Sequence, residues 1–394
     1  MFIVRMMFLL FVASASATSP PPAAGTVACV TGATGYLGLE LTAQLLRLGY
    51  EVRGTVRDLS TAKVAPLLAL PGAARLELMQ ADLLAGPSDF VACVAGASVV
   101  FHTASPFATK GITDPERQLV APALRGTEHV VGAALVADSV QTIVITSSIA
   151  ATMSGAADKG GACFDETDWN VKSTLAGRPE NGGGLDSYRY SKTVAERRFW
   201  EMIADPDWNP RGVAAAAILP SFIVGPPRSK RTSGESATFM KMAMEGKVPY
   251  RGDTPMCDVR DVAFAHIRAS TRPGAASGRL PVAFRAVDLA PFRYIISSKK
   301  KVQRSEVLRW LKVQYPHYTI AEDGPVKPAS ATIFCPTNLG KIGMAQDSND
   351  DIAEAEPPGP VLSFRTSKSS ILEMANSMLT KVNSVFPRPR EGEL

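Results

Sequence analysis

The sequence is poor in residues that hold metal ions and lacks the cysteine spacing of a disulfide framework. Among 394 residues there are four histidines and five cysteines. The cysteines lie far apart, with no Cys-x-x-Cys pair and no histidine-rich segment beside them. This spacing predicts neither a zinc site nor a disulfide framework, and it favours a reducing compartment. The five are Cys29, Cys93, Cys163, Cys257 and Cys335, and we expect Cys29, inside an apolar run, to be a small buried side chain.

The sequence also lacks a strong charge of one sign. The formal net charge is +5, and the charged residues are spread along the chain rather than gathered in one stripe. Nucleic-acid binding is therefore not indicated. The densest basic cluster, residues 299–301 with Arg304, is most simply a solvated loop or the start of a helix, and phosphate binding is the less favoured alternative.

An apolar run long enough to span a membrane is missing from the N-terminus, where a shorter pattern is found. Residues 1–17 carry one charge, Arg5, followed by apolar residues 6–13 and small residues 14–17. This pattern predicts a signal peptide cleaved after Ala17. We expect residues 1–25 to be a signal-like segment and a proline-rich linker. Two localisations stay open. The signal-like segment favours the secretory pathway, including the endoplasmic reticulum, or another organelle, whereas the unpatterned cysteines favour the cytoplasm.

What the sequence does contain is a glycine-rich turn between a strand pattern and a helix pattern. Residues 31–38 are Thr-Gly-Ala-Thr-Gly-Tyr-Leu-Gly, after the apolar residues 27–30 and before a helical pattern. Gly32 allows a sharp turn, Gly35 lets the backbone approach a pyrophosphate, and Gly38 lets the helix pack close to the strand. The helix N-terminus then faces the phosphates. Although any tight turn can use glycines, the strand and helix context predicts a dinucleotide-binding fold.

Strand and helix patterns alternate through the first 225 residues. This alternation predicts an α/β fold, a doubly wound parallel Rossmann sheet that extends to about residue 225. Residues 226–394 then form a smaller C-terminal part that covers the carboxyl ends of the strands, where ligands bind. Further strands are predicted at residues 50–57, 76–80, 99–102, 142–146 and 213–219, with helical stretches between them.

Tyr188 and Lys192 open a helical pattern and lie one turn apart on the same face. A free tyrosine titrates near 10, and a neighbouring ammonium lowers that pKa towards the operating pH that acid–base catalysis requires. Ser147 and Ser148 end the strand at residues 142–146, where a hydroxyl can donate to an oxygen that gains negative charge. The alternative for Tyr188 and Lys192 is that they are two surface residues on a helix. The alternative for Ser147 and Ser148 is that they only end the strand as turn residues, and only one of them needs to point towards a ligand.

Arg57 ends the second predicted strand, where enzymes that prefer NADP carry a base for the 2′-phosphate and those that prefer NAD carry an acid. Asp58 is adjacent, which leaves both cofactors possible. Arg53, Arg57 and Lys63 together favour NADP(H). The alternative is a set of exposed charges at a strand end.

With these features in this order, the sequence resembles the extended short-chain dehydrogenase/reductase superfamily, also called the NAD-dependent epimerase/dehydratase superfamily. More narrowly it is similar to the branch of dihydroflavonol reductases, cinnamoyl-CoA reductases and fungal methylglyoxal or ketone reductases. The resemblance covers residues 26 to about 280. The matching segments are residues 52–58, 102–107, 145–148, 188–192 and 220–226.

The resemblance implies roles for individual residues. Ser148 is implied as the catalytic serine, Tyr188 as the proton donor to a carbonyl, and Lys192 as the residue that binds the nicotinamide ribose and lowers the tyrosine pKa. Residues 26–225 are implied to be an NADP-binding domain. Its expected cofactor contacts come from five places in the sequence. They are Gly32, Gly35, Tyr36, Leu37 and Gly38 in the glycine turn; Arg57 and Lys63 after the second strand; Asp82 and Leu83, beside the adenine; Thr103, Ala104 and Ser105 after the fourth strand; and Pro220 and Ile223, near the nicotinamide.

The sequence departs from the family at two places. Residues 185–190 replace the Asn-Trp-Tyr-Cys-Tyr that leads into the catalytic helix of cinnamoyl-CoA reductases, which weakens an assignment to lignin chemistry. In the family a Gly-Arg pair such as Gly278-Arg279 runs straight into a strand like residues 294–298, whereas here residues 280–293 intervene. We interpret 280–293 as an insertion or, with some preference, a gene-model error. A second insertion is predicted at 345–360, whose Asp, Glu and Pro content indicates a disordered loop.

The predicted function is NADPH-dependent, reversible reduction of an aldehyde or ketone to an alcohol. The expected partner is a small carbonyl or alcohol substrate. We expect no nucleic acid, no metal and no clear membrane partner. An alternative within enzymes is a 3β-hydroxysteroid dehydrogenase or nucleotide-sugar epimerase/dehydratase, although the basic Arg57 argues against the sugar enzymes, which generally prefer NAD. A non-catalytic, NADPH-binding redox sensor is the alternative from another class. The carbonyl substrate and the oligomeric state stay open.

Overall fold

The fold was determined in a computed structural model, which describes residues 25–107, 111–155, 159–176, 184–230, 233–249, 252–271, 286–323, 333–342, 344–345 and 362–381. The predicted signal peptide lies outside the described residues. So do residues 280–285 of the first predicted insertion and 346–360 of the second.

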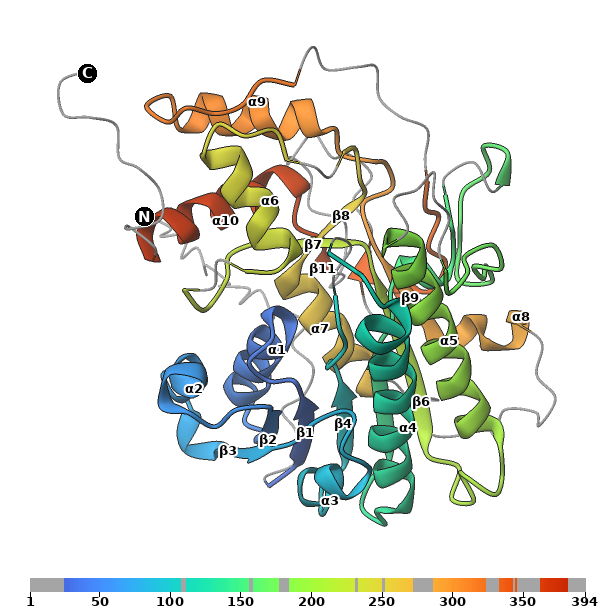
Figure 1. Ribbon diagram of the computed structural model, residues 1–394. Helices are drawn as coiled ribbons and strands as arrows, with labels where there is room; N and C mark the ends of the chain where they lie inside the picture. The colour runs from blue at the N-terminus through green and yellow to red at the C-terminus, as the bar shows by residue number, and fades with distance from the viewer. Residues whose placement is uncertain are drawn as a thin grey trace, which may run out of the picture.

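Seven parallel strands form one central sheet in the order β3-β2-β1-β4-β5-β6-β9 (Figure 1). Strands β4 and β6 are buried along their whole length, as expected for strands covered on both faces. The predicted doubly wound α/β fold is confirmed. The strands are β1 (Val27–Thr31), β2 (Glu51–Val56), β3 (Leu76–Gln80), β4 (Val99–His102), β5 (Thr142–Thr146), β6 (Ala214–Pro220) and β9 (Arg293–Ile296).

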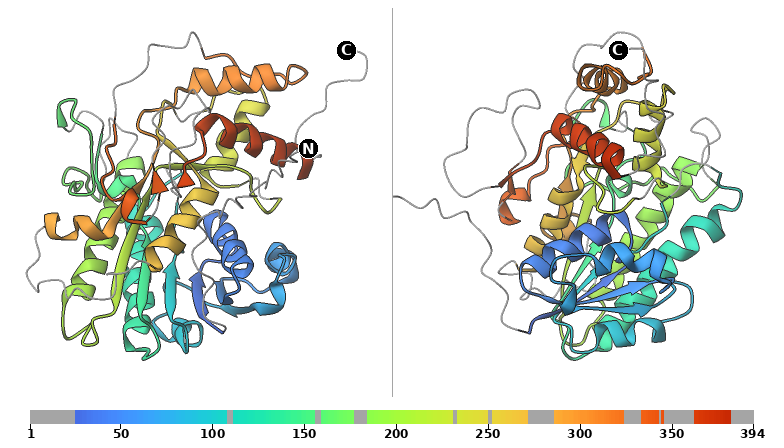
Figure 2. Two further views of the ribbon diagram at one scale, coloured as in Figure 1. Left: turned by 180° about the vertical axis from the view of Figure 1, so that it is seen from behind. Right: turned by 90° about the vertical axis from the view of Figure 1, so that its left-hand side faces the viewer.

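Helices cover both faces of this sheet. Helices α1 (Tyr36–Arg47) and α7 (Val259–Ser270) share one apolar core with the strands, to which α2 (Thr61–Leu68) also contributes. On the other face, a second core is formed by α3 (Ser88–Val94), α4 (Ala121–Val136) and α5 (Gly184–Ala204). The right-hand view of Figure 2 shows α7 on one side of the strands and α4 and α5 on the other. A π-helical turn, Glu116–Val120, leads into α4.

The sheet does not end near residue 225, and that prediction is wrong. The seventh strand, β9, pairs with β6 in parallel register, with Ile218 opposite Tyr294. Helix α7 also comes from beyond residue 225 and packs against α1. The sheet layer therefore needs residues from both sides of the predicted domain boundary. The family resemblance predicts a strand like residues 294–298, but not its place beside β6, because β9 follows a long excursion of the chain.

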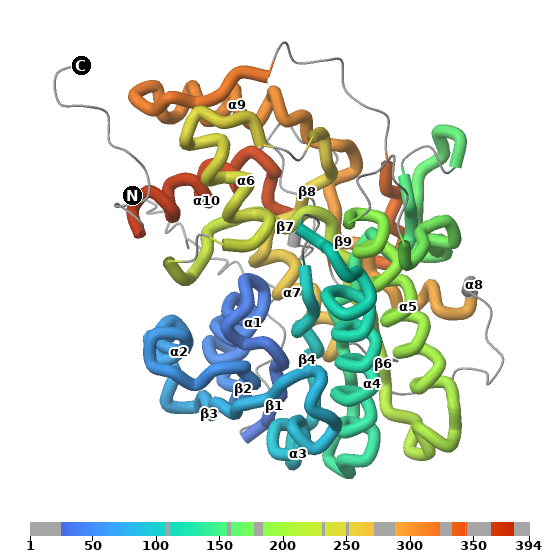
Figure 3. Tube along the Cα trace, viewed as in Figure 1, coloured from blue at the N-terminus to red at the C-terminus, as the bar shows by residue number. Residues whose placement is uncertain are grey.

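A smaller layer lies over the carboxyl ends of the strands. It contains the parallel pair β7 (Phe222–Val224) and β8 (Met256–Asp258), with α6 (Glu235–Met244), α9 (Arg304–Gln314) and α10 (Ser367–Lys381). Figure 3 shows these helices together above the sheet, and they share a third apolar core. Short elements complete the described fold: Ala73–Arg75, Ile149–Ala151, α8 (Ala286–Leu289), Ala290–Phe292, Leu339–Ile342, β10 (Met344–Ala345) and β11 (Leu362–Ser363).

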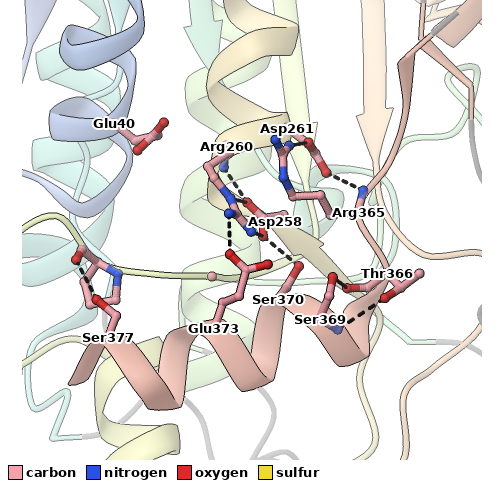
Figure 4. A network of polar contacts seen from close by, with 12 residues as sticks. Glu40, Asp258, Arg260, Asp261, Arg365, Thr366, Ser369, Ser370, Glu373 and Ser377 are labelled. Carbon is pink, nitrogen blue, oxygen red and sulfur yellow. Dashed lines mark hydrogen bonds and ion pairs between the residues drawn. The ribbon is translucent and has the colours of Figure 1, made fainter. Parts of the chain in front are cut away.

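A polar network fastens this layer to α7 (Figure 4). Asp258 caps α7 by accepting from the backbone N–H of Arg260 at 2.7 Å, and its other oxygen accepts from Ser370 of α10 at 2.6 Å. Arg260 in turn pairs with Glu373 at 2.5 Å. Asp261 accepts from the backbone and guanidinium of Arg365. These contacts fix α10 beside the start of α7.

Four of the five cysteines are paired, so the prediction of no disulfide framework is wrong. Cys29 of β1 is bonded to Cys93 of α3, and Cys163 is bonded to Cys335. Cys257 is free and buried. The partners are 64 and 172 residues apart in sequence, and only the packing of α3 on β1 and of two distant segments brings them together. Cys29 is buried as expected, but as half of a disulfide.

The first predicted insertion is partly included in the fold. Residues 286–292 form α8 and a short 3₁₀ helix, and Arg293 begins β9 with its side chain completely buried. Of the second predicted insertion, Ala345 belongs to the short strand β10. The hypothesis of a gene-model error at 280–293 stays a prediction.

Candidate active site

The glycine turn forms a cradle that excludes side chains. Gly32 has a φ of +67°, and a Cβ there would lie 3.0 Å from Ala104 Cβ. A Cβ on Gly35 would lie 3.0 Å from the carbonyl oxygen of Gly32, and one on Gly38 would overlap that same oxygen. The turn leads directly into the N-terminus of α1. Bare backbone before a helix N-terminus fits a pyrophosphate group.

The ends of β1 and β4 are locked together beside this cradle. Thr103 donates its hydroxyl to the carbonyl oxygen of Thr31 at 2.6 Å, and the backbone N–H of Ala104 donates to the Thr31 hydroxyl at 3.1 Å. The hydroxyl of Tyr36 donates to the carbonyl oxygen of Gly225, which ties the turn to the chain that follows β7. These bonds fix predicted cofactor residues of two segments, Tyr36 and Thr103 with Ala104, next to each other and to Gly225.

A cavity of about 200 Å³ lies over the cradle. The predicted residues Leu37 and Ser105 line it. The opposite wall was not predicted, because it comes from the smaller layer: Ser233 and Glu235 at the start of α6 and Met374 of α10. No spacing in the sequence links α10 to the glycine turn.

At the adenine end, the structure separates the predicted basic residues. Arg57 and Lys63 are exposed beyond the end of β2. The Asp58 carboxylate accepts from the backbone N–H of Ser60 at 2.8 Å, and this bond is the main cause of its lowered pKa. Arg53 is held elsewhere: it pairs with Glu77 at 3.3 Å and donates to the Ala92 carbonyl of α3. The sequence grouping of Arg53 with Arg57 and Lys63 is therefore wrong, since Arg53 contacts β3 and α3.

The other two residues predicted at the adenine follow β3. Asp82 is exposed, and its carboxylate accepts from the backbone N–H of Leu84 at 2.8 Å. Leu83 is half-buried and lies close to Gly126 of α4, where an added Cβ would come within 2.9 Å of it. Their roles stay predictions.

A second cavity, of about 600 Å³, brings together the three predicted catalytic residues. Tyr188 and Lys192 face it from α5, and Ser148 faces it from the end of β5. All three are at least 90 % buried. The Lys192 ammonium lies 5.8 Å from the centre of the Tyr188 ring. Pro220 and Ile223 also line this cavity, and their place near the nicotinamide stays a prediction.

Three consecutive residues at the end of β5 have different partners. The Thr146 hydroxyl is bonded to His266 of α7 at 2.7 Å, and Ser147 donates to Glu196 of α5 at 2.5 Å. The Ser148 oxygen accepts from the backbone N–H of Ala150 at 3.2 Å. Because accepting a bond leaves its proton available, Ser148 is the serine that can donate to a ligand in the cavity.

Burial controls the protonation of the ionisable groups here. Burial lowers the pKa of Lys192 to about 8, against the opposing effect of the Glu196 carboxylate. His102 of β4 is buried behind it, and burial and then the Lys192 charge lower its pKa to about 3. His102 is therefore neutral at physiological pH and is bonded to the Thr31 hydroxyl at 2.9 Å. Lys192 can titrate near neutrality, whereas His102 cannot.

The remaining wall of the larger cavity is mainly apolar. The Phe107 ring lies 4.9 Å from the Tyr188 ring, and Met153 and Phe222 lie on the same wall. Polar residues enter from the smaller layer at Asp253 and Lys301. The two cavities share lining residues of the glycine turn and of the segment after β4, so one continuous site extends from the cradle to Tyr188.

Within the described residues, no cluster of His, Cys, Asp and Glu could hold a metal ion. No described helix has the length and apolar character needed to cross a membrane.

The sequence matches the model of the NAD dependent epimerase/dehydratase family over residues 28–281. It is 33 % identical to cinnamoyl-CoA reductase CAD2 of Medicago truncatula over 316 residues, which cover 77 % of this chain and 86 % of that protein. It is 29 % identical to an anthocyanidin reductase of Vitis vinifera over 341 residues, which cover 82 % and 91 % of the two chains.

Solved structures resemble the fold over most of its length. Yeast methylglyoxal/isovaleraldehyde reductase Gre2, complexed with NADPH, has a TM-score of 0.70 and 23 % identity, covering 90 % of this chain and 98 % of its own. Gre2 of Candida albicans with NADPH has a TM-score of 0.69 and 25 % identity, covering 91 % and 99 %. Vestitone reductase of alfalfa has a TM-score of 0.63 and 26 % identity, covering 91 % and 98 %.

Proposed function

The chain belongs to the NAD dependent epimerase/dehydratase family, and from this membership we propose that it is an NADPH-dependent reductase that converts an aldehyde or ketone to an alcohol. Membership confirms the coarser prediction: the protein is an NAD(P)-dependent oxidoreductase of the extended short-chain dehydrogenase/reductase type. The carbonyl substrate, the phosphorylated form of the cofactor and the roles of single residues belong to the proposal.

One observation carries the proposal: Tyr188, Lys192 and Ser148 line the same cavity that continues into the glycine cradle. Bound NADPH supplies hydride to a carbonyl carbon. Ser148 donates a hydrogen bond to the carbonyl oxygen, and Tyr188 donates the proton that converts the developing alkoxide to an alcohol. Lys192 would hold the nicotinamide ribose, and its charge lowers the tyrosine pKa. In the reverse direction the same tyrosine accepts the proton.

Three observations support NADPH over NADH. Arg57 and Lys63 are exposed at the end of β2, where a 2′-phosphate lies in this type of fold. One carboxylate oxygen of Asp58, the acid that left the prediction open, accepts from the backbone N–H of Ser60, which directs it towards its own loop. The yeast and Candida reductases of similar fold have been solved with NADPH.

The cavity supports a medium-sized carbonyl compound with an apolar body. Its volume of about 600 Å³ has to hold the nicotinamide as well as the substrate, and Phe107, Met153 and Phe222 line the region around Tyr188. Consumption of NADPH, followed by absorbance across a panel of aliphatic aldehydes, aryl ketones and flavonoids, tests the proposal. Turnover of at least one carbonyl class is expected. A protein that binds NADPH but reduces no member of the panel would instead fit the redox-sensor alternative.

The proposal also separates this chain from sugar epimerases of the same family. Those enzymes generally prefer NAD and keep it through the cycle, whereas the exposed Arg57 favours NADPH that is consumed. Parallel assays with NADH and NADPH test this, with faster turnover expected for NADPH and no conversion of nucleotide sugars.

We propose further that the protein matures in an oxidising compartment, such as the secretory pathway. The two disulfides support this, because disulfides persist mainly in such compartments. They also remove the cysteine-based argument for a reducing compartment. Thiol labelling of the denatured, unreduced protein tests the pairing: only Cys257 is expected to react. A fusion of residues 1–25 to a reporter tests the targeting signal.

A further inference from the structure

A buried polar chain connects three elements behind the catalytic residues. Ser147, which directly follows β5, donates to the Glu196 carboxylate of α5 at 2.5 Å, and Arg293 of β9 donates its Nε–H to the same carboxylate at 2.7 Å. Exposure is 5 % for Ser147, 1 % for Glu196 and 0 % for Arg293. Trp200 adds a third donor at 3.3 Å. The carboxylate is therefore removed from water and satisfied only by protein donors.

Glu196 lies on the catalytic face of α5. It is one turn beyond Lys192 and two turns beyond Tyr188, and residues four apart on a helix are neighbours. Its partner Ser147 is the residue directly before Ser148. The carboxylate thus joins the two elements that supply the catalytic groups. Its bond to Ser147 is made at the residue next to Ser148, and Glu196 itself lies one helical turn from Lys192.

Arg293 extends this connection away from the cavity. Its Nη1 donates to the carbonyl oxygens of Glu166 and Asp168, each at 2.7 Å, and the guanidinium stacks 4.0 Å from the centre of the Trp169 ring. A buried ion pair seldom adds net stability over well-packed apolar residues. Stability alone therefore gives little reason for this arrangement beside the catalytic groups.

We propose that Ser147, Glu196 and Arg293 are positioning residues of the active site. They fix the end of β5 to α5 so that the Ser148 and Tyr188 hydroxyls meet at one carbonyl oxygen, and the Glu196 charge keeps Lys192 in its protonated form. This proposal rests on the proposed carbonyl reduction and adds residues to it. Glu196 and Arg293 line neither cavity, and Ser147, which lies on the wall of the larger one, donates its hydroxyl to Glu196.

The electrostatic part makes a definite prediction for pH. The titratable groups that face Lys192 are Tyr188 and Glu196 on its own helix and His102 on β4. His102 is already neutral, with a pKa of about 3, so it adds no charge near neutral pH. Removing the negative charge of Glu196 leaves burial unopposed and leaves the Arg293 cation unpaired. Both effects make the Tyr188–Lys192 pair lose its proton at lower pH.

The E196Q variant tests this electrostatic role. Reduction needs the protonated pair, so activity falls on the alkaline side as the proton is lost. In E196Q this alkaline limb of the kcat profile is expected to move to lower pH by about one unit, with the KM for NADPH within about twofold of wild type. The pH dependence of NADPH binding, followed by cofactor fluorescence, is expected to shift in the same direction and needs no carbonyl substrate.

The S147A variant tests the geometric role without leaving a buried charge unpaired. A displaced Ser148 is expected to lower kcat roughly tenfold, because small misplacements of reacting groups are costly, while the KM for NADPH is unchanged. Ser370→Ala is the matched control. Ser370 of α10 also donates its hydroxyl to a buried carboxylate, that of Asp258, at 2.6 Å, this carboxylate also keeps an arginine partner, Arg260, and Ser370 lines neither cavity. S370A is expected to keep the wild-type kcat.

Thermal unfolding of each variant separates loss of positioning from loss of the fold. If E196Q does not fold, the kcat of S147A compared with that of its control tests the proposal. The proposal is overturned if the alkaline limb and the binding profile of E196Q coincide with wild type, or if S147A loses no more activity than S370A. Failure of the proposed function would differ, since wild-type protein would then reduce no carbonyl while the binding profiles still respond.

Discussion

The two halves of the sheet form their parts of the site in different ways. In the half that contains β1, β2 and β3, the cofactor cradle comes from one turn of eight residues, and its shape depends on backbone atoms. In the half that contains β5, β6 and β9, the proposed catalytic groups come from separate elements, and Glu196 connects the end of β5, α5 and β9. Changes in the first half should therefore alter cofactor affinity, and changes in the second should alter turnover.

The largest expected effect is on turnover in the catalytic half. Tyr188→Phe removes the proposed proton donor, and kcat is expected to fall about 10³-fold, with NADPH affinity within about twofold of wild type. Steady-state kinetics and fluorescence titration with NADPH measure the two quantities. Tyr190→Phe is the control, since Tyr190 lies two residues along α5 and does not line either cavity. Full carbonyl reduction by Y188F would refute the mechanism.

A change in the cofactor half should reverse this pattern. In Gly35→Ala, the added Cβ meets the Gly32 carbonyl oxygen at 3.0 Å and occupies space next to the pyrophosphate. Affinity for NADPH and NADH is expected to fall roughly 100-fold, about 2.8 kcal/mol, with a smaller change in kcat at saturation. Gly132→Ala in α4 is the control, because its Cβ would have only ordinary contacts, the closest at 3.5 Å. Equal loss of affinity in both variants would break the comparison.

A more selective change in the cofactor half concerns the phosphate. In Arg57→Ala, NADPH affinity is expected to fall roughly tenfold, about 1.4 kcal/mol, because Arg57 is exposed and its ion pair is weakened by water. NADH affinity is expected to stay unchanged. In the control Arg53→Ala, the ratio of the two affinities should stay at the wild-type value, since Arg53 contacts Glu77 and α3. A loss of NADH affinity as large as that of NADPH would contradict the assignment.

The smallest expected effect is at the rim of the catalytic half. The Cys163–Cys335 disulfide lies two residues from Ile333, which lines the larger cavity. Replacing both cysteines by serine is expected to raise the KM for the carbonyl roughly threefold, under about 1 kcal/mol, with cofactor affinity unchanged. The same double replacement at Cys29 and Cys93, which line neither cavity, should leave that KM as in wild type. An equal response of the two pairs would show that the effect is on general stability.

The sequence predicted groups of residues that are close together along the chain better than groups that are far apart along it. The glycine turn and the Tyr188–Lys192 pair each lie within a few residues, so local spacing was enough to predict where they stand. Arg293 lies 97 residues from Glu196, and it falls in a segment whose sequence we interpreted as an insertion. The choice between Ser147 and Ser148 came from family resemblance, and the bond between Ser147 and Glu196 now gives it a physical basis.

The errors have the same physical origin. Both disulfides, the place of β9 in the sheet and the separation of Arg53 from Arg57 depend on which elements pack together, and no periodicity in the sequence records that packing. The wall formed by α6 and α10 over the cradle was missed for the same reason. Sequence patterns identified the elements that present the site, whereas its supports required the tertiary structure.

The late position of β9 has a consequence for how this enzyme can move. The chain leaves the sheet after β6, forms β7, α6 and β8, returns as α7 and β9, and then continues to α9 and α10. The smaller layer is therefore joined to the sheet by several chain crossings rather than by one hinge. A swing of the whole layer, as in enzymes with two domains on a single linker, would strain every crossing. Ligand entry should thus involve local loop motion, and a preference for one carbonyl over another should change through individual wall residues.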